Sequence, residues 1–431
     1  MLRRSHLFRV SLPFLTALLA AAPPGAAGED RPAGRDPAIE PYIRFLEGHG
    51  QDPVDYILGL FKDHDLVVIC ERSHPEMTQY DLLLKVVGDR RFIEDVGHVF
   101  TEVGTRSAGP DIDSFLTDAS LPEKEIDRKV LSIYEELSFF PLWDKTNFGE
   151  FLKGIHRINR ALSGAERIHL IPTDQAFDWR GMTREKYREF EKGLGERDKA
   201  MADWIVEKMS AIREGPERRK KGLVIMNFRH AFPHFTLSRG GKTVKIQNTG
   251  GFLLEALPGK VANVMVNSVR ILQGSRDSRI AHAAMLDGKW DAAFRALGDP
   301  ARGFDFRGSP FGDDPFDYFP FPIPVNFKYR DEFTGFVFYK PLREHKMSFG
   351  IPGITTEAFK AELLRRFRDS GNDAPEEDLK SMIERIGSLQ VFGYEKEDVF
   401  GKTDLEGSIG KWLGKPQVSA GTPAGSGRPA K

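Results

Sequence analysis

The chain of 431 residues is 40% hydrophobic and 29% charged, and 62 basic side chains stand against 63 acidic ones for a net charge of −1. This composition predicts a globular protein with a large core, and it offers no basic excess for binding nucleic acid. The single cysteine, Cys70, excludes an intramolecular disulfide and any multi-cysteine metal centre.

The N-terminus has the three parts of a secretory signal. Arg3, Arg4 and Arg9 precede an apolar run over residues 10–22, and small residues follow it. We therefore expect cleavage near Ala27 and export to the periplasm or the medium. The apolar run is shorter than the roughly 20 residues that span a bilayer, and no later segment reaches that length, so no transmembrane span is expected in the mature chain.

Composition divides the rest of the chain. Residues 28–37, rich in Gly, Pro and charge, predict a flexible leader, and the Gly/Pro/Ser/Ala tail over residues 416–431 predicts disorder. Between them we predict one α/β domain over residues 38–350 and a C-terminal helical extension over residues 351–415.

Apolar and β-branched runs predict the strands of that domain. Strands are expected to begin at residues 66, 99 and 223 and to cover residues 168–171, 261–266 and 333–339. Helical periodicity lies between them, so the fold class is α/β, with a central mixed or mostly parallel β-sheet flanked by helices.

Four segments outside the strands carry further predictions. Residues 112–161 are expected to form a helical insert that could cap the site, and residues 186–212 one long helix. Residues 300–325 are dense in Phe, Gly, Asp and Pro and predict an ordered loop. A final helical segment is expected over residues 356–386.

Polar residues follow three of the predicted strands. The first ends in Glu71, Arg72 and, two residues on, His74; the second ends in Glu102; the third leads into Arg229 and His230. Ligands in open α/β sheets bind outside the carboxyl ends of the strands, so these side chains are expected to form one cluster.

Such a cluster suits hydrolysis by activated water. His74 is the predicted base, because histidine is the side chain whose ordinary pKa suits proton removal near neutral pH. Glu71 or Glu102 would orient its ring, Arg72 or Arg229 would hold the developing oxyanion, and His230 would donate to it or to the leaving group. No Gly-x-Ser-x-Gly motif is present, which favours water over a serine nucleophile.

Structural interpretations remain open for the same residues. Glu71 and His74 could instead be a hydrogen-bonded pair that caps the next helix, and Asp174 with Arg197 could be a buried ion pair rather than supporting site residues. The aromatic residues 139, 140 and 143 line either a substrate pocket or the core.

The order of these motifs resembles the erythromycin esterase family, which is grouped with Tiki-type proteases and ChaN-type haem-binding lipoproteins. The matching pieces are Glu71-Arg72-Ser73-His74, Glu102, the segment Arg197-Asp198-Lys199-Ala200-Met201-Ala202, His230, and the segment Asn248 to Leu253. Two residues depart from the family pattern: Cys70 stands where glycine is usual, and Asn227 stands where the esterases have a first histidine.

The resemblance implies an exported hydrolase that cleaves an ester, lactone or peptide bond of a small-molecule or peptide substrate. Its Tiki-type branch implies that His74, Glu71, Glu102 and His230 could hold a divalent metal, either zinc, manganese or iron. Its ChaN-type branch implies the alternative of a haem- or ligand-binding protein without catalysis, in which the Phe-rich loop and the histidines would serve.

Overall fold

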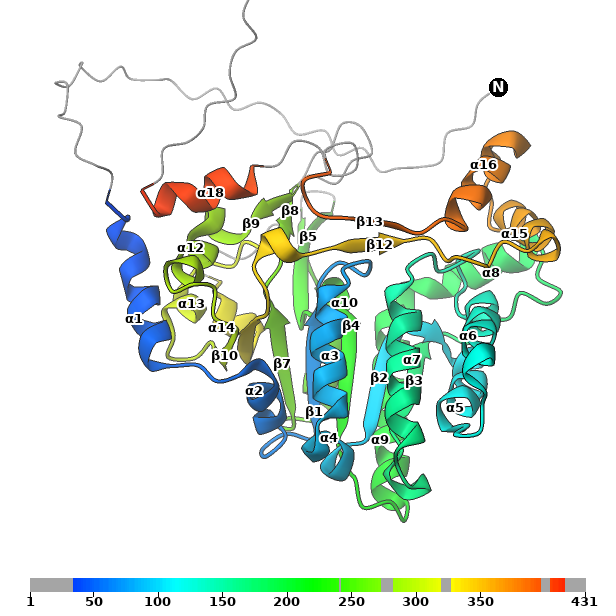
Figure 1. Ribbon diagram of the computed structural model, residues 1–431, viewed down its shortest axis with the longest axis horizontal. Helices are drawn as coiled ribbons and strands as arrows, with labels where there is room; N and C mark the ends of the chain where they lie inside the picture. Colours follow the sequence, from blue (N-terminus) through cyan, green and yellow to red (C-terminus); the bar gives the residue numbers. More distant parts are fainter. Residues whose placement is uncertain (1–33, 240–241, 273–281, 319–326, 397–403, 415–431) are drawn as a thin grey trace, which may run out of the picture.

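A computed structural model of the chain describes residues 34–239, 242–272, 282–318, 327–396 and 404–414 (Figure 1). The predicted signal peptide, most of the predicted leader and the predicted tail lie outside these residues. No helix in the described ranges is long and apolar enough to cross a membrane.

One seven-stranded sheet organises the fold, in the order β10-β11-β7-β1-β4-β2-β3. All neighbouring strands are parallel except the edge pair β10 and β11. The strands are β1 (Leu66–Glu71), β2 (His98–Thr105), β3 (His169–Asp174), β4 (Gly222–Asn227), β7 (Val261–Val266), β10 (Arg302–Asp305) and β11 (Gly335–Phe338). The α/β class and the mostly parallel sheet predicted from the sequence are thus confirmed.

The sheet is buried on both faces. In β1, Val67 and Ile69 belong to one core cluster, while Leu66, Val68 and Cys70 belong to the other. Continuous apolar runs are expected for strands covered on both sides, which is why these segments were recognisable in the sequence.

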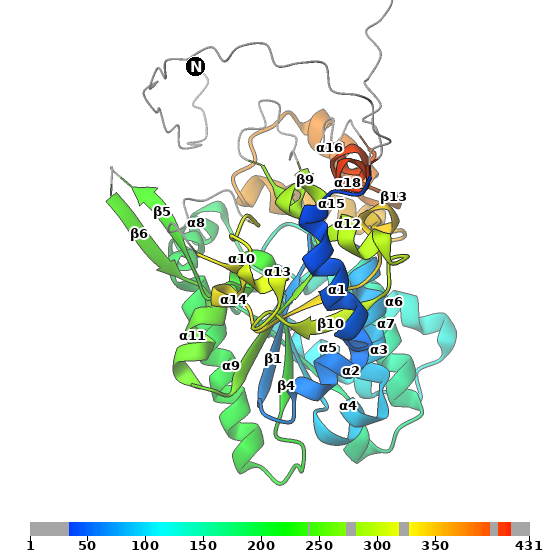
Figure 2. The same ribbon diagram turned by 90° about the vertical axis from the view of Figure 1, so that its left-hand side faces the viewer.

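Two layers of helices cover the sheet, as the two views at right angles show (Figures 1 and 2). The first layer comprises α2 (Pro53–Leu60), α3 (Thr78–Gly88), α4 (Arg90–Asp95), α5 (Gly109–Thr117), α6 (Glu123–Glu136) and α7 (Asn147–Arg160). The second comprises α1 (Glu40–Gly48), α9 (Arg197–Glu214), α10 (Phe228–Ala231), α11 (Thr249–Ala256), α12 (Lys289–Ala296), α13 (Pro310–Asp313), α14 (Tyr329–Glu332) and α18 (Leu405–Trp412).

The remaining elements lie around this core. They are α8 (Arg184–Gly193), α15 (Glu357–Asp369), α16 (Glu376–Ile386) and the two-stranded pairs β5 (His234–Arg239) with β6 (Lys242–Gln247), β8 (Val269–Ile271) with β9 (His282–Ala284), and β12 (Met347–Phe349) with β13 (Gln390–Phe392). Buried residues of α15 and α16, such as Leu363 and Ile383, join the first core cluster.

Two helices expected from the sequence are each divided in the structure. The predicted helix over residues 186–212 ends at Gly193 and resumes as α9, because two glycines in three residues weaken the helix there. The segment over residues 356–386 forms α15 and α16 with a turn between them, where Gly371 adopts a φ of +87° that other residues avoid.

Two further predictions need correction. Residues 300–325 do not form a loop throughout, because β10 and α13 lie within them. The 112–161 insert covers the site only in part: its helices α6 and α7 pack on the sheet face, where Ile133 and Phe151 are buried in the first core cluster, while residues 137–145 between them line a cavity at the ends of the strands.

Asp291 in α12 supplies a pH-dependent term in stability. The residue is 7% exposed, and burial raises the pKa of its carboxyl to about 7. A carboxyl whose pKa is raised by folding makes its full contribution to stability below its unfolded pKa, and this contribution is lost progressively as the pH rises from about 4 to 7.

We therefore expect Asp291→Asn to increase the free energy of unfolding at pH 8, by up to about 4 kcal/mol, with a smaller gain at pH 5. Urea denaturation at the two pH values measures the effect, and Asp63→Asn, at an exposed position, is the matched control. A difference from wild type that does not change with pH would contradict this assignment.

Candidate active site

A cavity of about 530 Å³ lies at the carboxyl ends of the parallel strands. Its polar wall consists of His74, Glu102, Asp174, Arg197, Asn227, Arg229 and His230. Its other wall comes from the connection over residues 137–145 and from helices α15 and α16. The cavity thus contains six of the eight site residues predicted from the sequence.

Glu71 and His74 form a tight pair at the end of β1. Glu71 is buried, and its Oε2 lies 2.8 Å from His74 Nδ1 while its Oε1 accepts from the Tyr80 hydroxyl at 2.8 Å. Because a carboxylate only accepts hydrogen bonds, Nδ1 carries a proton, and in the neutral form of the ring the lone pair lies on Nε2. His74 is 21% exposed in the cavity, and the Trp143 indole meets its ring edge to face at 4.8 Å.

Glu102 is the centre of the charged cluster. Its Oε1 lies 3.1 Å from His230 Nε2, 3.1 Å from Arg197 Nη2 and 3.8 Å from His74 Nε2, and its Oε2 accepts from the Asn227 backbone N–H. Burial alone would raise the pKa of Glu102, but the neighbouring His230, His74 and Arg197 hold it well below the ordinary value. Glu102 lies within β2 rather than at its end, one residue beyond the last pair between β2 and β4.

His230 is clamped between two carboxylates. Its side chain is 3% exposed, with Nδ1 2.7 Å from Asp198 Oδ1 and Nε2 facing Glu102. Burial opposes the charged form, yet Glu102 and Asp198 together raise the pKa of His230. The imidazolium therefore persists to a higher pH than for an ordinary histidine.

Sequence reasoning missed Asp198 as a site residue. It opens α9 directly after Arg197, and its Oδ1 also accepts from the Thr249 N–H at 3.0 Å and hydroxyl at 2.9 Å. The only sequence signal was its place in the Arg-Asp motif, since the residue comes from the first turn of a helix and not from a strand end.

The two arginines that line the cavity differ in their exposure to solvent and in their ion pairs. Arg197 is 15% exposed and donates two hydrogen bonds to Asp174, at 2.8 and 2.7 Å, so the predicted ion pair exists and anchors α9 to β3. Arg229 is 46% exposed; its Nη2 lies 3.2 Å from His230 Nε2 and 4.0 Å from Asp198. Of the two, the Arg229 guanidinium is therefore the more accessible to a molecule in the cavity.

Arg72, predicted as an oxyanion holder, is placed elsewhere. Its side chain is fully buried outside the cavity, and its Nη1 donates to Glu76 and Thr78 at 2.8 Å. Its Nε and Nη2 donate to Asn267 and to the Tyr339 carbonyl, so all five N–H groups have partners. Arg72 holds the end of the sheet together and does not line the cavity.

The four predicted metal ligands do not converge on one point. Glu71 lies behind the His74 ring, with its oxygens taken by His74 and Tyr80, while the Glu102 oxygen nearest the histidines already faces Arg197. A guanidinium in that position competes with a cation for the same oxygen. In the described part of the chain, no group of three or more His, Cys, Asp or Glu side chains is arranged to hold a metal ion.

The Phe-rich segment also lies apart from His74. Phe304, Phe306 and Phe311 are buried in the second core cluster around Trp290, so they form the interior of the protein and not a wall beside the histidines. Residues 319–326 of the segment fall outside the described residues.

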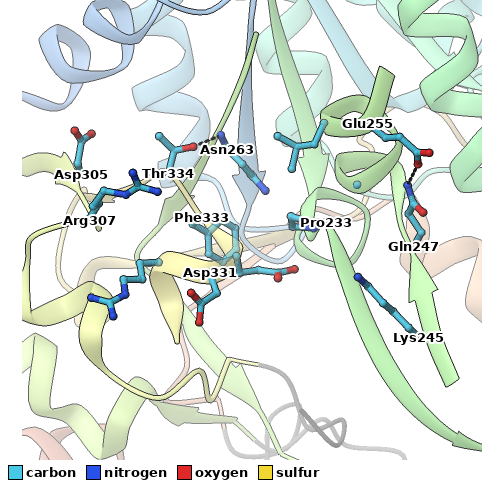
Figure 3. Close-up of a pocket in the computed structure, with 14 residues that line it drawn as sticks. Pro233, Lys245, Gln247, Glu255, Asn263, Asp305, Arg307, Asp331, Phe333 and Thr334 are labelled. Carbon is cyan, nitrogen blue, oxygen red and sulfur yellow. Dashed lines mark hydrogen bonds between the residues drawn. The ribbon is translucent and has the colours of Figure 1, made fainter. Parts of the chain in front are cut away.

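A second cavity of about 660 Å³ lies near the β10–β11 edge of the sheet (Figure 3). Asn263 and Thr334 lie on one of its sides, and Lys245 and Gln247 lie on the other. Its lining contains neither histidine nor cysteine. It therefore lacks a side chain whose ordinary pKa suits proton removal at neutral pH.

Comparisons with known proteins leave the family open. No family model and no curated protein matches the chain. Among solved structures, a Bacillus cereus protein has a TM-score of 0.44 at 10% identity, covering 70% of this chain and 97% of that one. A mutant of the erythromycin esterase EreC in its open conformation has a TM-score of 0.42 at 12% identity, covering 71% and 96%. A succinoglycan biosynthesis protein has a TM-score of 0.40 at 9% identity, covering 67% and 90%. At TM-scores below 0.5, these distant likenesses carry no conclusion about family or activity.

Proposed function

We propose that the protein is a hydrolase that cleaves an ester, lactone or peptide bond with water activated by His74. The observation that carries this proposal is the His74 imidazole in a cavity, its Nδ1 held 2.8 Å from buried Glu71 and its Nε2 3.8 Å from Glu102, with Arg197, Arg229 and His230 lining the same cavity. A carboxylate, an oriented histidine and facing cations are the parts that acyl transfer to water needs.

The two histidines take different roles in this mechanism. His74 Nε2 removes a proton from water as the water oxygen bonds to the substrate carbonyl carbon. The carbonyl oxygen becomes an oxyanion, which the positive charges of Arg229 and His230 stabilise. The bond to the leaving group then breaks, and that group takes the proton back from His74, while Glu71 stabilises the transient imidazolium.

The role of the His230 charge can be tested by replacing Asp198 and measuring the pH dependence of kcat/KM. Because the Asp198 carboxylate helps to raise the pKa of His230, Asp198→Asn should lower that pKa and remove the positive charge at a lower pH. We expect the alkaline limb of the kcat/KM profile to move to lower pH, and NMR titration of labelled histidine to show the same direction. Asp203→Asn, an exposed carboxylate on the same helix, is the control. An unmoved alkaline limb would contradict the role of His230.

The first experiment is hydrolysis of a panel of esters, lactones and peptides by the purified chain from residue 28 onward, with and without EDTA. We expect turnover of at least one class, retained in EDTA, because the mechanism draws on imidazole and guanidinium groups of the chain. Loss of turnover in EDTA would show that a bound metal ion, and not the His74 imidazole alone, activates the water. Absence of turnover, together with a sharp Soret band on haem titration, would favour the haem-binding alternative.

Export is part of the same proposal. The basic, apolar and small-residue regions of residues 1–27 support it. Expression of the full chain in a bacterial host, followed by N-terminal sequencing of the periplasmic product, should give a start near residue 28.

A further inference from the structure

The active-site cavity has an apolar half that the proposed chemistry does not use. The wall outside the charged cluster contains seven apolar side chains, those of Leu137, Phe140, Leu142, Trp143, Phe367, Met382 and Ile386, together with Ser138, Asp144 and Lys145. These side chains come from the connection between α6 and α7 and from the two C-terminal helices. The cavity is thus polar on the side of the catalytic cluster and largely apolar on the other.

Phe140 shows that this half is open. Its side chain is 45% exposed, whereas Phe139, in contact with it at 4.5 Å, is 3% exposed. Only four large hydrophobic side chains of the described ranges are exposed to this degree, and Phe140 alone among them lines the cavity. Apolar area left in water beside a reactive cluster favours a ligand that covers it.

The wall is also built in advance of any ligand. On α15 and α16, Leu363 and Ile383 are buried in the protein core. The buried Arg366 guanidinium further ties α15 to Glu136 of α6, at 3.1 Å. The cavity faces of these helices are therefore held in place, as is usual for preformed ligand sites.

We propose that this half binds an apolar acyl group of the substrate, so that the enzyme prefers esters or amides of apolar carboxylic acids several carbons long. The inference rests on the proposed function. Hydrolysis leaves a carboxylate, which suits the side of Arg229 and His230. The chain attached to that carboxyl carbon then extends toward the apolar wall opposite.

Two measurements test this proposal. The first is kcat/KM for p-nitrophenyl esters from acetate to octanoate, which we expect to rise about fourfold per added methylene until the cavity is filled. The second is calorimetric binding of sodium octanoate and sodium acetate, which needs no turnover. Octanoate should bind, acetate should not, and octanoate should change the fluorescence of Trp143, with Trp143→Phe as the reference.

Single substitutions test whether the side chains of the apolar wall are responsible for the chain-length preference. Phe140→Ala and Met382→Ala should each lower the octanoate-to-acetate ratio of kcat/KM by about tenfold and weaken octanoate binding. Leu389→Ala changes an exposed leucine, 50% exposed, that does not line the cavity, and it should leave both unchanged.

The outcomes distinguish this inference from the proposed function. Ester hydrolysis without chain-length preference, and without octanoate binding, would overturn the apolar site while leaving a hydrolase. Octanoate binding that depends on Phe140, in a protein that hydrolyses no ester, would uphold the apolar site and overturn the hydrolase. Neither hydrolysis nor binding would overturn both.

Discussion

His74→Ala is expected to lower kcat/KM by about a hundred- to ten-thousandfold, the usual contribution of a positioned general base. The fold should survive, because the side chain is 21% exposed and is not part of either core cluster. Its loss leaves Glu71 with the Tyr80 hydroxyl and with water from the cavity, so the free energy of unfolding should fall by less than about 2 kcal/mol. Steady-state kinetics and urea denaturation of the same preparation measure the two effects.

His169→Ala is the matched control for this variant. His169 is also paired with a carboxylate, Asp113 at 3.0 Å, but it lies in β3 outside the active-site cavity. It should retain wild-type kcat/KM. The assignment of His74 as the base would be wrong if its replacement unfolded the protein while the remaining folded fraction kept full activity.

Arg72→Met should lower the free energy of unfolding by about 3–5 kcal/mol, because it leaves the buried Glu76 carboxylate without its cation. Burial acts to raise the pKa of Glu76, yet Arg72 holds it at about 2. A carboxyl whose pKa is lowered by folding stabilises the protein above its unfolded value, near 4.3, and loses that contribution as the pH falls toward 2. The effect of Arg72→Met should therefore shrink in acid.

Two further variants make this prediction specific. Arg72→Met combined with Glu76→Gln removes the unpaired charge and should recover part of the lost stability, measured by urea denaturation at pH 7. Arg91→Met removes an arginine that is 51% exposed and paired with Asp55 and Asp89, and it should lower stability by less than about 1 kcal/mol. If the Arg72→Lys protein folds but its turnover is greatly reduced, the structural role would be wrong and Arg72 would act in catalysis.

The strands and the polar residues that follow them could both be predicted, because burial on both faces of the sheet restricts where polar residues can stand. A parallel strand covered on two faces must be apolar throughout, so Glu71, His74, Glu102 and His230 stand out where that requirement ends. They meet in space because parallel strands share a carboxyl end. The direction of a side chain within a turn carries no such signal, so the sequence does not show that Arg72 lies outside the cavity.

The remaining parts of the site depend on contacts between distant segments. Asp198 reaches His230 because α9 packs beside β3, through buried residues such as Met201 and through the Arg197–Asp174 ion pair, and no local pattern shows this packing. Likewise, the periodicity of residues 356–386 predicts helices but does not say which surface they cover. Their position beside the cavity depends on contacts with segments that are distant in the sequence.

The proposed acid–base residues are separated along the chain from the C-terminal part of the apolar wall, and this separation has an evolutionary consequence. His74, Glu102, Asp198 and His230 all precede residue 231, whereas Phe367, Met382 and Ile386 lie within α15 and α16. Mutations confined to those two helices can alter which molecules are accepted while the reaction chemistry is inherited unchanged. Divergence among descendants of this protein should therefore concentrate in residues 357–386, and a library randomised there is a direct route to new specificities.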